Sequence, residues 1–169
     1  MIHLRHLAGA ALASVLLAGS VAAPAAASAR ETVAVSSTEA AARPGNGKIL
    51  YDRISGGRGT LKIKNGAGRD AVVTLVRGRS KAISVYVRAR STAYVRDVRD
   101  GTYTIFFTSG YRYSTSRGRF TGSPSYQRFT SKLRFTTTSS SSTIWTLTLN
   151  PVRGGNARTT GVNPNDFPT

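Results

Sequence analysis

Tyrosine and arginine alternate along two neighbouring segments of this 169-residue chain. Tyr86 stands two positions before Arg88, and Tyr94 stands two positions before Arg96. If the two segments pair as a hairpin, the four side chains share its outer face, because residues two apart on a strand point the same way. Rings beside guanidinium groups suit anionic polymers, since the charges hold the polymer backbone while the rings stack on its bases or sugars.

The combination of tyrosine and arginine recurs farther along the chain, where Tyr111, Arg112 and Tyr113 are consecutive and Arg117 and Arg119 follow. Together the two regions predict a ligand-binding surface. The alternative is a structural role without a ligand, because tyrosine and arginine also stabilise the solvent-exposed face of a sheet through cross-strand pairs. The candidate binding residues are Tyr86, Arg88, Tyr94, Arg96, Tyr111, Arg112 and Tyr113.

Side chains that commonly perform catalysis are scarce. The chain has no cysteine, and its two histidines, His3 and His6, lie in a segment that we expect to be removed. The mature chain would then lack the usual proton-transfer group near neutral pH and the ligands of zinc and copper sites. Serine and threonine are abundant but have no evident base beside them. We therefore expect no enzyme activity, no catalytic residue, no metal and no cofactor.

Paired carboxylates are the remaining route to acid/base catalysis. Asp97 and Asp100 lie three positions apart, and each has an arginine beside it. On a strand and turn they would tend to point to different faces, so the sequence favours turn formation and a local ion pair. A calcium site would need six or more oxygen ligands, which no acidic run supplies.

The chain is strongly basic. Its 24 Lys and Arg against 7 Asp and Glu give a net charge of +17, which becomes +16 when Arg5 is lost with the first 29 residues. Such a charge concerns partners and solubility, not fold. Arginine outnumbers lysine 19 to 5, which suits bidentate binding of phosphate or carboxylate. Codon bias on a solvated surface would produce the same excess.

The first 29 residues have the layout of an export signal. A short basic start is followed by an apolar stretch over residues 7–23 and by the small residues Ala27, Ser28 and Ala29. Cleavage is expected before Arg30. We therefore predict a secreted, extracellular protein with no membrane span after processing, which non-covalent contacts could retain at the cell surface.

Apolar residues alternate with polar ones through most of the remaining chain, which is typical of strands with one buried face. Residues 65–68, Asn-Gly-Ala-Gly, predict a hairpin turn between strands at 61–64 and 71–76. A second hairpin is predicted from 83–88 and 93–96. Further strands are expected at 102–107, around Phe120 and Phe129, at 133–136 and at 144–149, and exposed loops at 109–118 and 136–143.

These strands, with no helical periodicity, predict an all-β fold. We expect a small antiparallel β-sandwich of about seven to eight strands, with a partly open β-barrel as the alternative. Residues 30–47 are predicted to be a flexible linker, and residues 48–169 a single basic β domain. Its C-terminal tail is expected to pack along the domain through Val162 and Phe167.

Residues 59–113 resemble PEGA and carboxypeptidase-regulatory-like β-sandwich modules. The resemblance lies in the paired short strands, the segment Asp-Gly-Thr-Tyr-Thr-Ile at 100–105 and the Gly-Tyr pair at 110–111. Those modules are mostly non-catalytic.

More of the chain, from about Gly59 to the end, is similar to bacterial exported proteins of unassigned function. The shared features are Val-Tyr-Val-Arg-Ala at 85–89, the Gly-Thr-Tyr strand at 101–103, Phe129 with Leu-x-Phe-x-Thr at 133–137, Trp145 with Thr-Leu at 148–149, and an ending from Gly-Gly-Asn-Ala at 154–157 to Asp-Phe-Pro at 166–168. This resemblance implies a single β domain that includes the tail, and it implies no activity.

The sequence thus predicts a non-catalytic secreted or cell-surface module whose basic, aromatic face binds anionic polymers such as teichoic acid, acidic polysaccharide or extracellular nucleic acid. The alternative is a protein-interaction or self-assembly module. Strand order, ligand identity and oligomeric state are left open.

Overall fold

The computed structural model describes residues 43–150 and 158–168. The predicted signal peptide and most of the predicted linker lie outside these residues. Among the described residues the fold is all-β, as predicted, and no helix is long and apolar enough to cross a membrane. The elements are β1 (Ile49–Asp52), β2 (Gly59–Asn65), β3 (Asp70–Arg77), β4 (Ser80–Val87), β5 (Ser91–Val98), β6 (Gly101–Ser114), β7 (Arg119–Phe129), β8 (Leu133–Phe135), β9 (Ile144–Thr148), β10 (Thr159–Gly161) and the 3-10 turn η1 (Pro164–Asp166).

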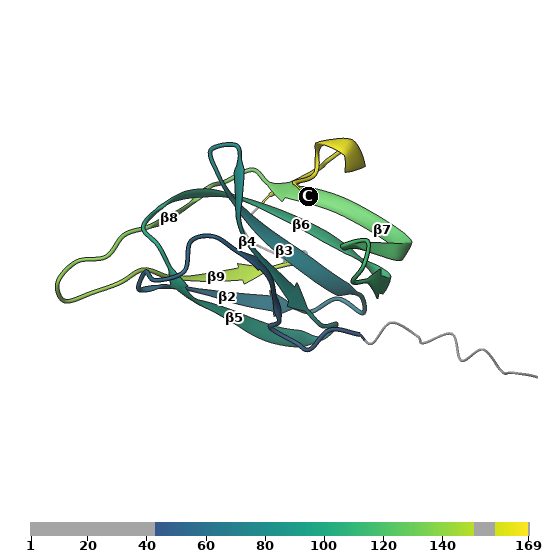
Figure 1. The fold of residues 1–169 in the computed structure, drawn as a ribbon, viewed down its shortest axis with the longest axis horizontal. Coiled ribbons are helices and arrows are strands. Elements are labelled where there is room, and N and C mark those ends of the chain that lie inside the picture. Colours follow the sequence, from purple (N-terminus) through teal and green to yellow (C-terminus); the bar gives the residue numbers. More distant parts are fainter. Residues whose placement is uncertain (1–42, 151–157, 169) are drawn as a thin grey trace, which may run out of the picture. The chain divides into compact units, whose positions relative to one another are not determined.

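The strands form two sheets that face each other, so the predicted sandwich is confirmed and neither sheet closes into a barrel (Figure 1). The large sheet has the order β1-β4-β3-β6-β7-β10, and β8 also pairs with β6. The small sheet has the order β5-β2-β9. Its β2 and β9 run parallel, which departs from the antiparallel arrangement that we predicted for all strands.

The core lies between the two sheets. Leu61 and Ile63 of the small sheet face inward with no exposed surface, as do Val73, Leu75 and Ile105 of the large sheet. Each fully buried side chain of this kind stabilises the fold by about 1.5 to 3 kcal/mol. Because the chain has no disulfide, this packing is the main source of stability.

The predicted hairpin between residues 61–64 and 71–76 is wrong. β2 pairs with β5 and β9, whereas β3 pairs with β4 and β6, so the chain crosses between sheets at the Asn-Gly turn. The buried Asn65 side chain secures this crossing, because its amide donates to the carbonyls of Arg69 (2.8 Å) and Arg88 (3.1 Å) and its oxygen accepts from the Ala67 N–H (3.2 Å).

The second predicted hairpin, between residues 83–88 and 93–96, is also wrong, because β4 belongs to the large sheet and β5 to the small one. Here the chain crosses at Arg90, whose φ of 53° lies in the left-handed region. The Arg90 N–H donates to the Ala67 carbonyl at 3.0 Å. The two crossings therefore hold each other in place.

β6 contains the predicted strand at 102–107 and carries Tyr103, Ile105 and Phe107 on its inner face. The predicted loop at 109–118 is largely strand instead, because β6 continues to Ser114 and the turn before β7 spans only residues 115–118. Strand β7 includes both Phe120 and Phe129. Residues 136–143 are irregular and mostly exposed, as expected.

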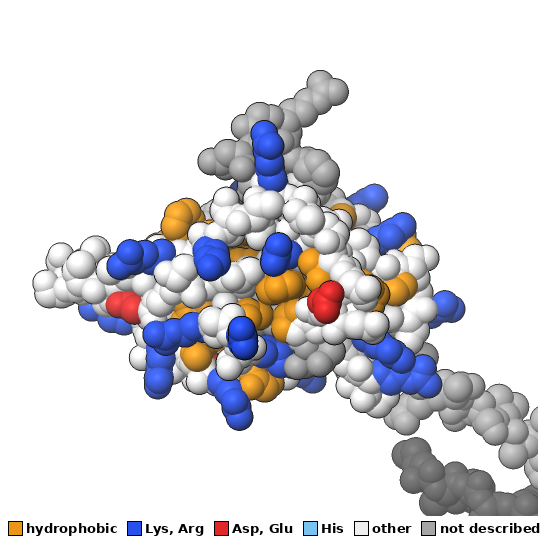
Figure 2. All heavy atoms as spheres, turned by 90° about the horizontal axis from the view of Figure 1, so that it is seen from above, with side chains coloured by type: hydrophobic (Ala, Val, Ile, Leu, Met, Phe, Trp, Pro, Cys, Tyr) orange, Lys and Arg blue, Asp and Glu red, His pale blue; other side chains and the backbone are white. Residues whose placement is uncertain are grey.

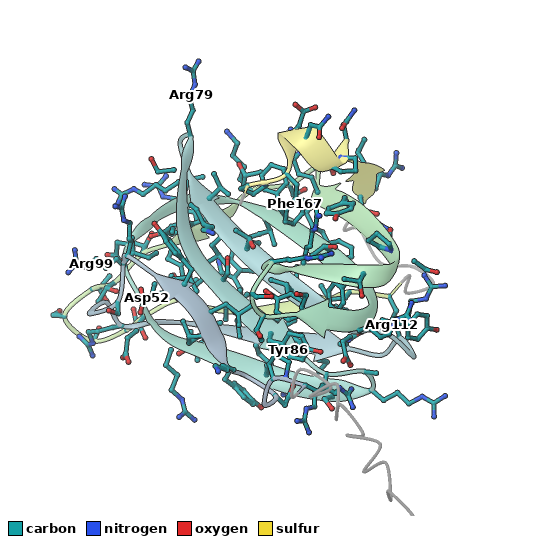
Figure 3. The ribbon with its side chains drawn as sticks, turned by 45° about the vertical axis from the view of Figure 1, so that its right-hand side comes forward. Asp52, Arg79, Tyr86, Arg99, Arg112 and Phe167 are labelled. Carbon is teal, nitrogen blue, oxygen red and sulfur yellow. The ribbon has the colours of Figure 1, made fainter. Side chains whose placement is uncertain are left out.

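The C-terminal tail packs on the large sheet, as predicted. β10 pairs with β7, and the Val162 N–H donates to the Tyr126 carbonyl at 3.0 Å. Phe167 is labelled in Figure 3. Its ring lies edge-on to the rings of Phe106 and Tyr126, with centroid distances of 5.9 and 5.2 Å.

Candidate binding surfaces

The seven predicted binding residues do not form one surface. Because β4 and β5 belong to different sheets, the predicted outer face shared by Tyr86, Arg88, Tyr94 and Arg96 does not exist. Tyr86 is fully buried, in a small cluster with Val72, Tyr113 and Phe120. Its ring packs edge-on to that of Tyr113 at a centroid distance of 5.2 Å.

Arg88 holds the main chain at the start of the domain. Its Nε donates to the Pro44 carbonyl at 3.0 Å, and its own N–H donates to the Asn46 side chain at 3.0 Å. The Gly47 N–H donates to the Tyr86 carbonyl at 2.8 Å. Residues 43–47, which the sequence predicts to be part of the linker, are thus hydrogen-bonded to the sandwich. The Arg88 guanidinium is used in this contact.

Tyr94 and Arg96 remain on the outside, on the outer face of the small sheet. Strand register places Lys62 directly between Tyr94 and Thr146, and Lys64 between Thr92 and Thr148. We call this surface the small-sheet face. Its nine outward residues are all exposed or half-buried: Thr60, Lys62, Lys64, Thr92, Tyr94, Arg96, Ile144, Thr146 and Thr148.

The small-sheet face combines positive charge with an accessible ring. Tyr94 is 48% exposed, and the Lys62 ammonium and the Arg96 guanidinium lie 5.6 and 6.0 Å from its ring centroid. These are cation–π distances. Lys64 adds a third cation, and the one acid of β2, β5 and β9 is Asp97, which is exposed beside Arg96 near the end of β5. The face therefore offers a flat ring flanked by cations.

A second surface is a groove of about 610 Å³ at the other candidate residues. Its lining residues come from the segment before β1, the turn before β3, the start of β3, the crossing after β4, and the β6–β7 hairpin: Arg43, Gly68, Asp70, Ala89, Tyr111, Arg112, Tyr113, Ser114 and Thr121. We call it the β6–β7 groove. Its volume is in the range typical of small-ligand sites.

The walls of the β6–β7 groove carry aromatic rings and guanidinium groups. Tyr111 is 49% exposed, and the Arg69 guanidinium lies 5.1 Å from its ring centroid. Arg112 is exposed, with a φ of 52°, next to a β-bulge between Ser109 and Tyr111. Bulges and left-handed backbone in non-glycine residues redirect side chains and are frequent at binding sites.

Gly110 allows the close approach that forms this bulge. A Cβ at this position would lie 2.8 Å from the Cβ of Phe120 and 2.9 Å from the Gly122 carbonyl oxygen. A side chain at position 110 would therefore separate β6 from β7 and displace the residues that line the groove.

Asp70 forms the centre of a hydrogen-bond network beside the groove. Its carboxylate accepts from the Arg43 guanidinium with both oxygens, from the Tyr86 hydroxyl, and from the Ala89 N–H at 2.8 Å. Burial raises the pKa of the Asp70 carboxyl, but these hydrogen bonds outweigh burial and bring the pKa below its ordinary value of 3.8. Burial and the nearby carboxylate raise the pKa of Tyr86, which stays protonated and donates.

This network predicts acid sensitivity. A carboxyl whose pKa is lower in the folded state stabilises the fold above its unfolded pKa and stops doing so as the pH falls through its folded value. We expect the urea midpoint to decrease between pH 5 and pH 2, and to decrease less in the Asp70→Asn variant, which has no carboxyl to protonate there. Equal pH dependence in the two proteins would show that the Asp70 network has no part in it.

Asp97 and Asp100 do not form the predicted local ion pairs. Asp100 instead accepts from the N–H and hydroxyl of Thr137, both at 2.8 Å, and Asp97 adopts a left-handed φ of 60°. The one ion pair among the described residues joins Arg43 and Asp70. Within that same part of the chain, no three His, Cys, Asp or Glu residues gather as metal ligands would.

The sequence analysis did not include Lys62 and Lys64 among the binding candidates, because it did not predict that β2 pairs with β5. That pairing places Lys62 beside Tyr94. Arg43, Arg69 and Asp70 were missed as well. The signal for these was weak, since Arg69 and Asp70 merely follow a glycine-rich turn and Arg43 precedes a proline.

Comparison with known proteins adds no relative: no family model matches the chain, and no match was found among curated proteins or solved structures.

Proposed function

We propose that this protein is a non-catalytic secreted or cell-surface β module that binds anionic polymers through the small-sheet face. The observation that carries the proposal is the exposed Tyr94 ring with Lys62 and Arg96 within cation–π distance, on a sheet whose three strands carry Asp97 as their one acid. An extended polyanion can follow such a face, with its charges on the cations and a base or sugar on the ring.

The distribution of charge supports the proposal. The described residues hold 21 of the 24 Lys and Arg and only five of the seven acids. Of these acids, Asp70 is neutralised by Arg43, and Asp52 and Asp100 accept hydrogen bonds from nearby groups of the chain. Figure 2 shows another face of the domain, where Lys and Arg side chains also greatly outnumber acidic ones.

A salt series tests whether the binding is local or diffuse. We expect the Lys62→Gln/Arg96→Gln variant to leave a single-stranded DNA or teichoic acid column at lower salt than wild type. On DNA, loss of two phosphate contacts should reduce the slope of log K against log salt by about 1.4. The matched control is Arg79→Gln/Arg117→Gln, which removes the same charge from two hairpin turns, and Arg79 extends from the β3–β4 tip (Figure 3).

If both double variants elute together, binding by the small-sheet face is refuted and the charge acts diffusely. If wild type shows no salt-dependent retention on either polymer, the polymer proposal fails altogether. The alternative of a protein partner would then become the leading one. Ile144 favours that alternative, because an exposed apolar side chain on an edge strand can pack against another protein. Ile144 is 69% exposed on β9, which is an edge strand of the small sheet among the described strands.

A further inference from the structure

The β6–β7 groove is distinct from the small-sheet face in residues and position. The two surfaces share no residue. Arg112 lies on the opposite side of the domain from Asp52, and Asp52 lines the smaller hollow that includes Tyr94 and Arg96 (Figure 3). A ligand in the groove therefore need not contact the small-sheet face.

The charges of the groove favour an anion. Asp70 is the one acid in its lining, and its two oxygens already accept from Arg43, Tyr86 and Ala89. The Arg43–Asp70 pair is neutral as a unit. Arg112 lines the groove, and Arg69 lies next to it, near the Tyr111 ring. Both are exposed and have no acidic partner among the described residues, so they give this region its positive charge.

The other groups of the groove suit a sugar ring. The exposed Tyr111 ring supplies a flat apolar surface, and Ser114 and Thr121 add hydroxyl groups. The Thr121 hydroxyl donates to the Arg112 carbonyl at 2.9 Å, which leaves its oxygen free to accept from a ligand. Two unpaired guanidinium groups match one or two carboxylates, not the continuous row of phosphates in a nucleic acid strand.

We propose that the β6–β7 groove is a second binding site, which takes a uronic acid unit of an acidic polysaccharide. The sugar carboxylate pairs with the Arg112 guanidinium, the ring lies against Tyr111, and the sugar hydroxyls bond to Ser114 and Thr121. This site does not depend on the small-sheet face and can exist if that face binds nothing.

The test measures binding of digalacturonate to the full mature chain by NMR titration or calorimetry. Neutral galactobiose has the same ring geometry without the carboxylates, and uridine monophosphate carries a phosphate and a base. We expect digalacturonate to bind at least tenfold more tightly than either, because charge-assisted hydrogen bonds to Arg112 are roughly twice as strong as neutral ones. Binding should shift the ring resonances of Tyr111 and not those of Tyr94.

Variants separate this site from the small-sheet face. We expect Arg112→Gln and Tyr111→Ala each to weaken digalacturonate binding about tenfold, and Lys62→Gln/Arg96→Gln to leave it unchanged. Thermal unfolding of each variant shows whether its fold is retained, and Arg69→Gln provides a second charge deletion away from the strained backbone.

Three results would overturn the proposal. Equal affinity for galactobiose would mean that the carboxylate is not recognised. Tighter binding of uridine monophosphate would make the groove a nucleotide site. Normal affinity in both the Arg112→Gln and the Arg69→Gln variants would place the ligand elsewhere.

Discussion

Replacing Asp70 with alanine is expected to lower the free energy of unfolding by about 3 kcal/mol, since hydrogen bonds to a charged group contribute about 1.5 to 3 kcal/mol and more than one is lost. The Asp70 side chain is only 12% exposed, and it accepts from three groups. Without it, the hydroxyl of the buried Tyr86 and the N–H of Ala89 lose their acceptor. Urea unfolding at pH 7 measures the loss.

Two further variants determine which contact matters. Arg43 is 53% exposed, so solvent weakens its ion pair with Asp70. Arg43→Ala should therefore lower the free energy of unfolding by about 1 kcal/mol or less. Asp166→Ala changes an exposed acid in η1 and should alter stability by no more than about 0.5 kcal/mol. If Asp70→Ala unfolds at the same urea concentration as Asp166→Ala, the network is not a source of stability.

The sequence predicts which residues of a strand are buried better than it predicts which strands pair, because the alternation of apolar and polar residues reports only burial. A period of two tells which residues of a strand are buried, and Leu61 and Ile63, which alternate with Lys62 and Lys64, are buried. It does not tell which strand lies beside them. In a sandwich, consecutive strands present the same pattern whether they pair as a hairpin or face each other across the core. The sequence therefore predicts a hairpin at the Asn-Gly turn at 65–66, although the chain crosses between sheets there.

The sequence predicts only part of the candidate site, again because alternation indicates which side chains are exposed but not which strands pair. Tyr94 and Arg96 are exposed on one face of β5, as their spacing indicated. Tyr86 does point away from the main core, but Tyr113 and Phe120 cover it. The second cluster forms because β6 and β7 extend beyond the predicted loop boundary, and local periodicity carries no information on contacts between residues so distant in sequence.

Phe135 shows how the short strand β8 contributes to closing the sandwich. Its side chain is 1% exposed and packs edge-on to Tyr103, with ring centroids 5.7 Å apart. A Cβ on Gly59 would lie 2.5 Å from the Phe135 ring, so β2 approaches the ring as closely as a glycine permits. Phe135 thus joins strands of the two sheets beside the exposed 136–143 segment.

Truncating Phe135 to alanine is expected to lower the free energy of unfolding by about 3 to 5 kcal/mol, because the ring is fully buried and its loss leaves a cavity between the sheets. Since domains of this size are stable by only about 5 to 15 kcal/mol, this loss is a large fraction of the total, and the variant should unfold at a clearly lower temperature than wild type. Circular dichroism during thermal and urea unfolding measures the effect. The Phe135→Leu variant keeps most of the apolar volume and should lose less than about 1.5 kcal/mol. Equal stability of the alanine and leucine variants would show that the sandwich does not depend on this ring, and that β8 is held by its backbone pairing with β6 alone.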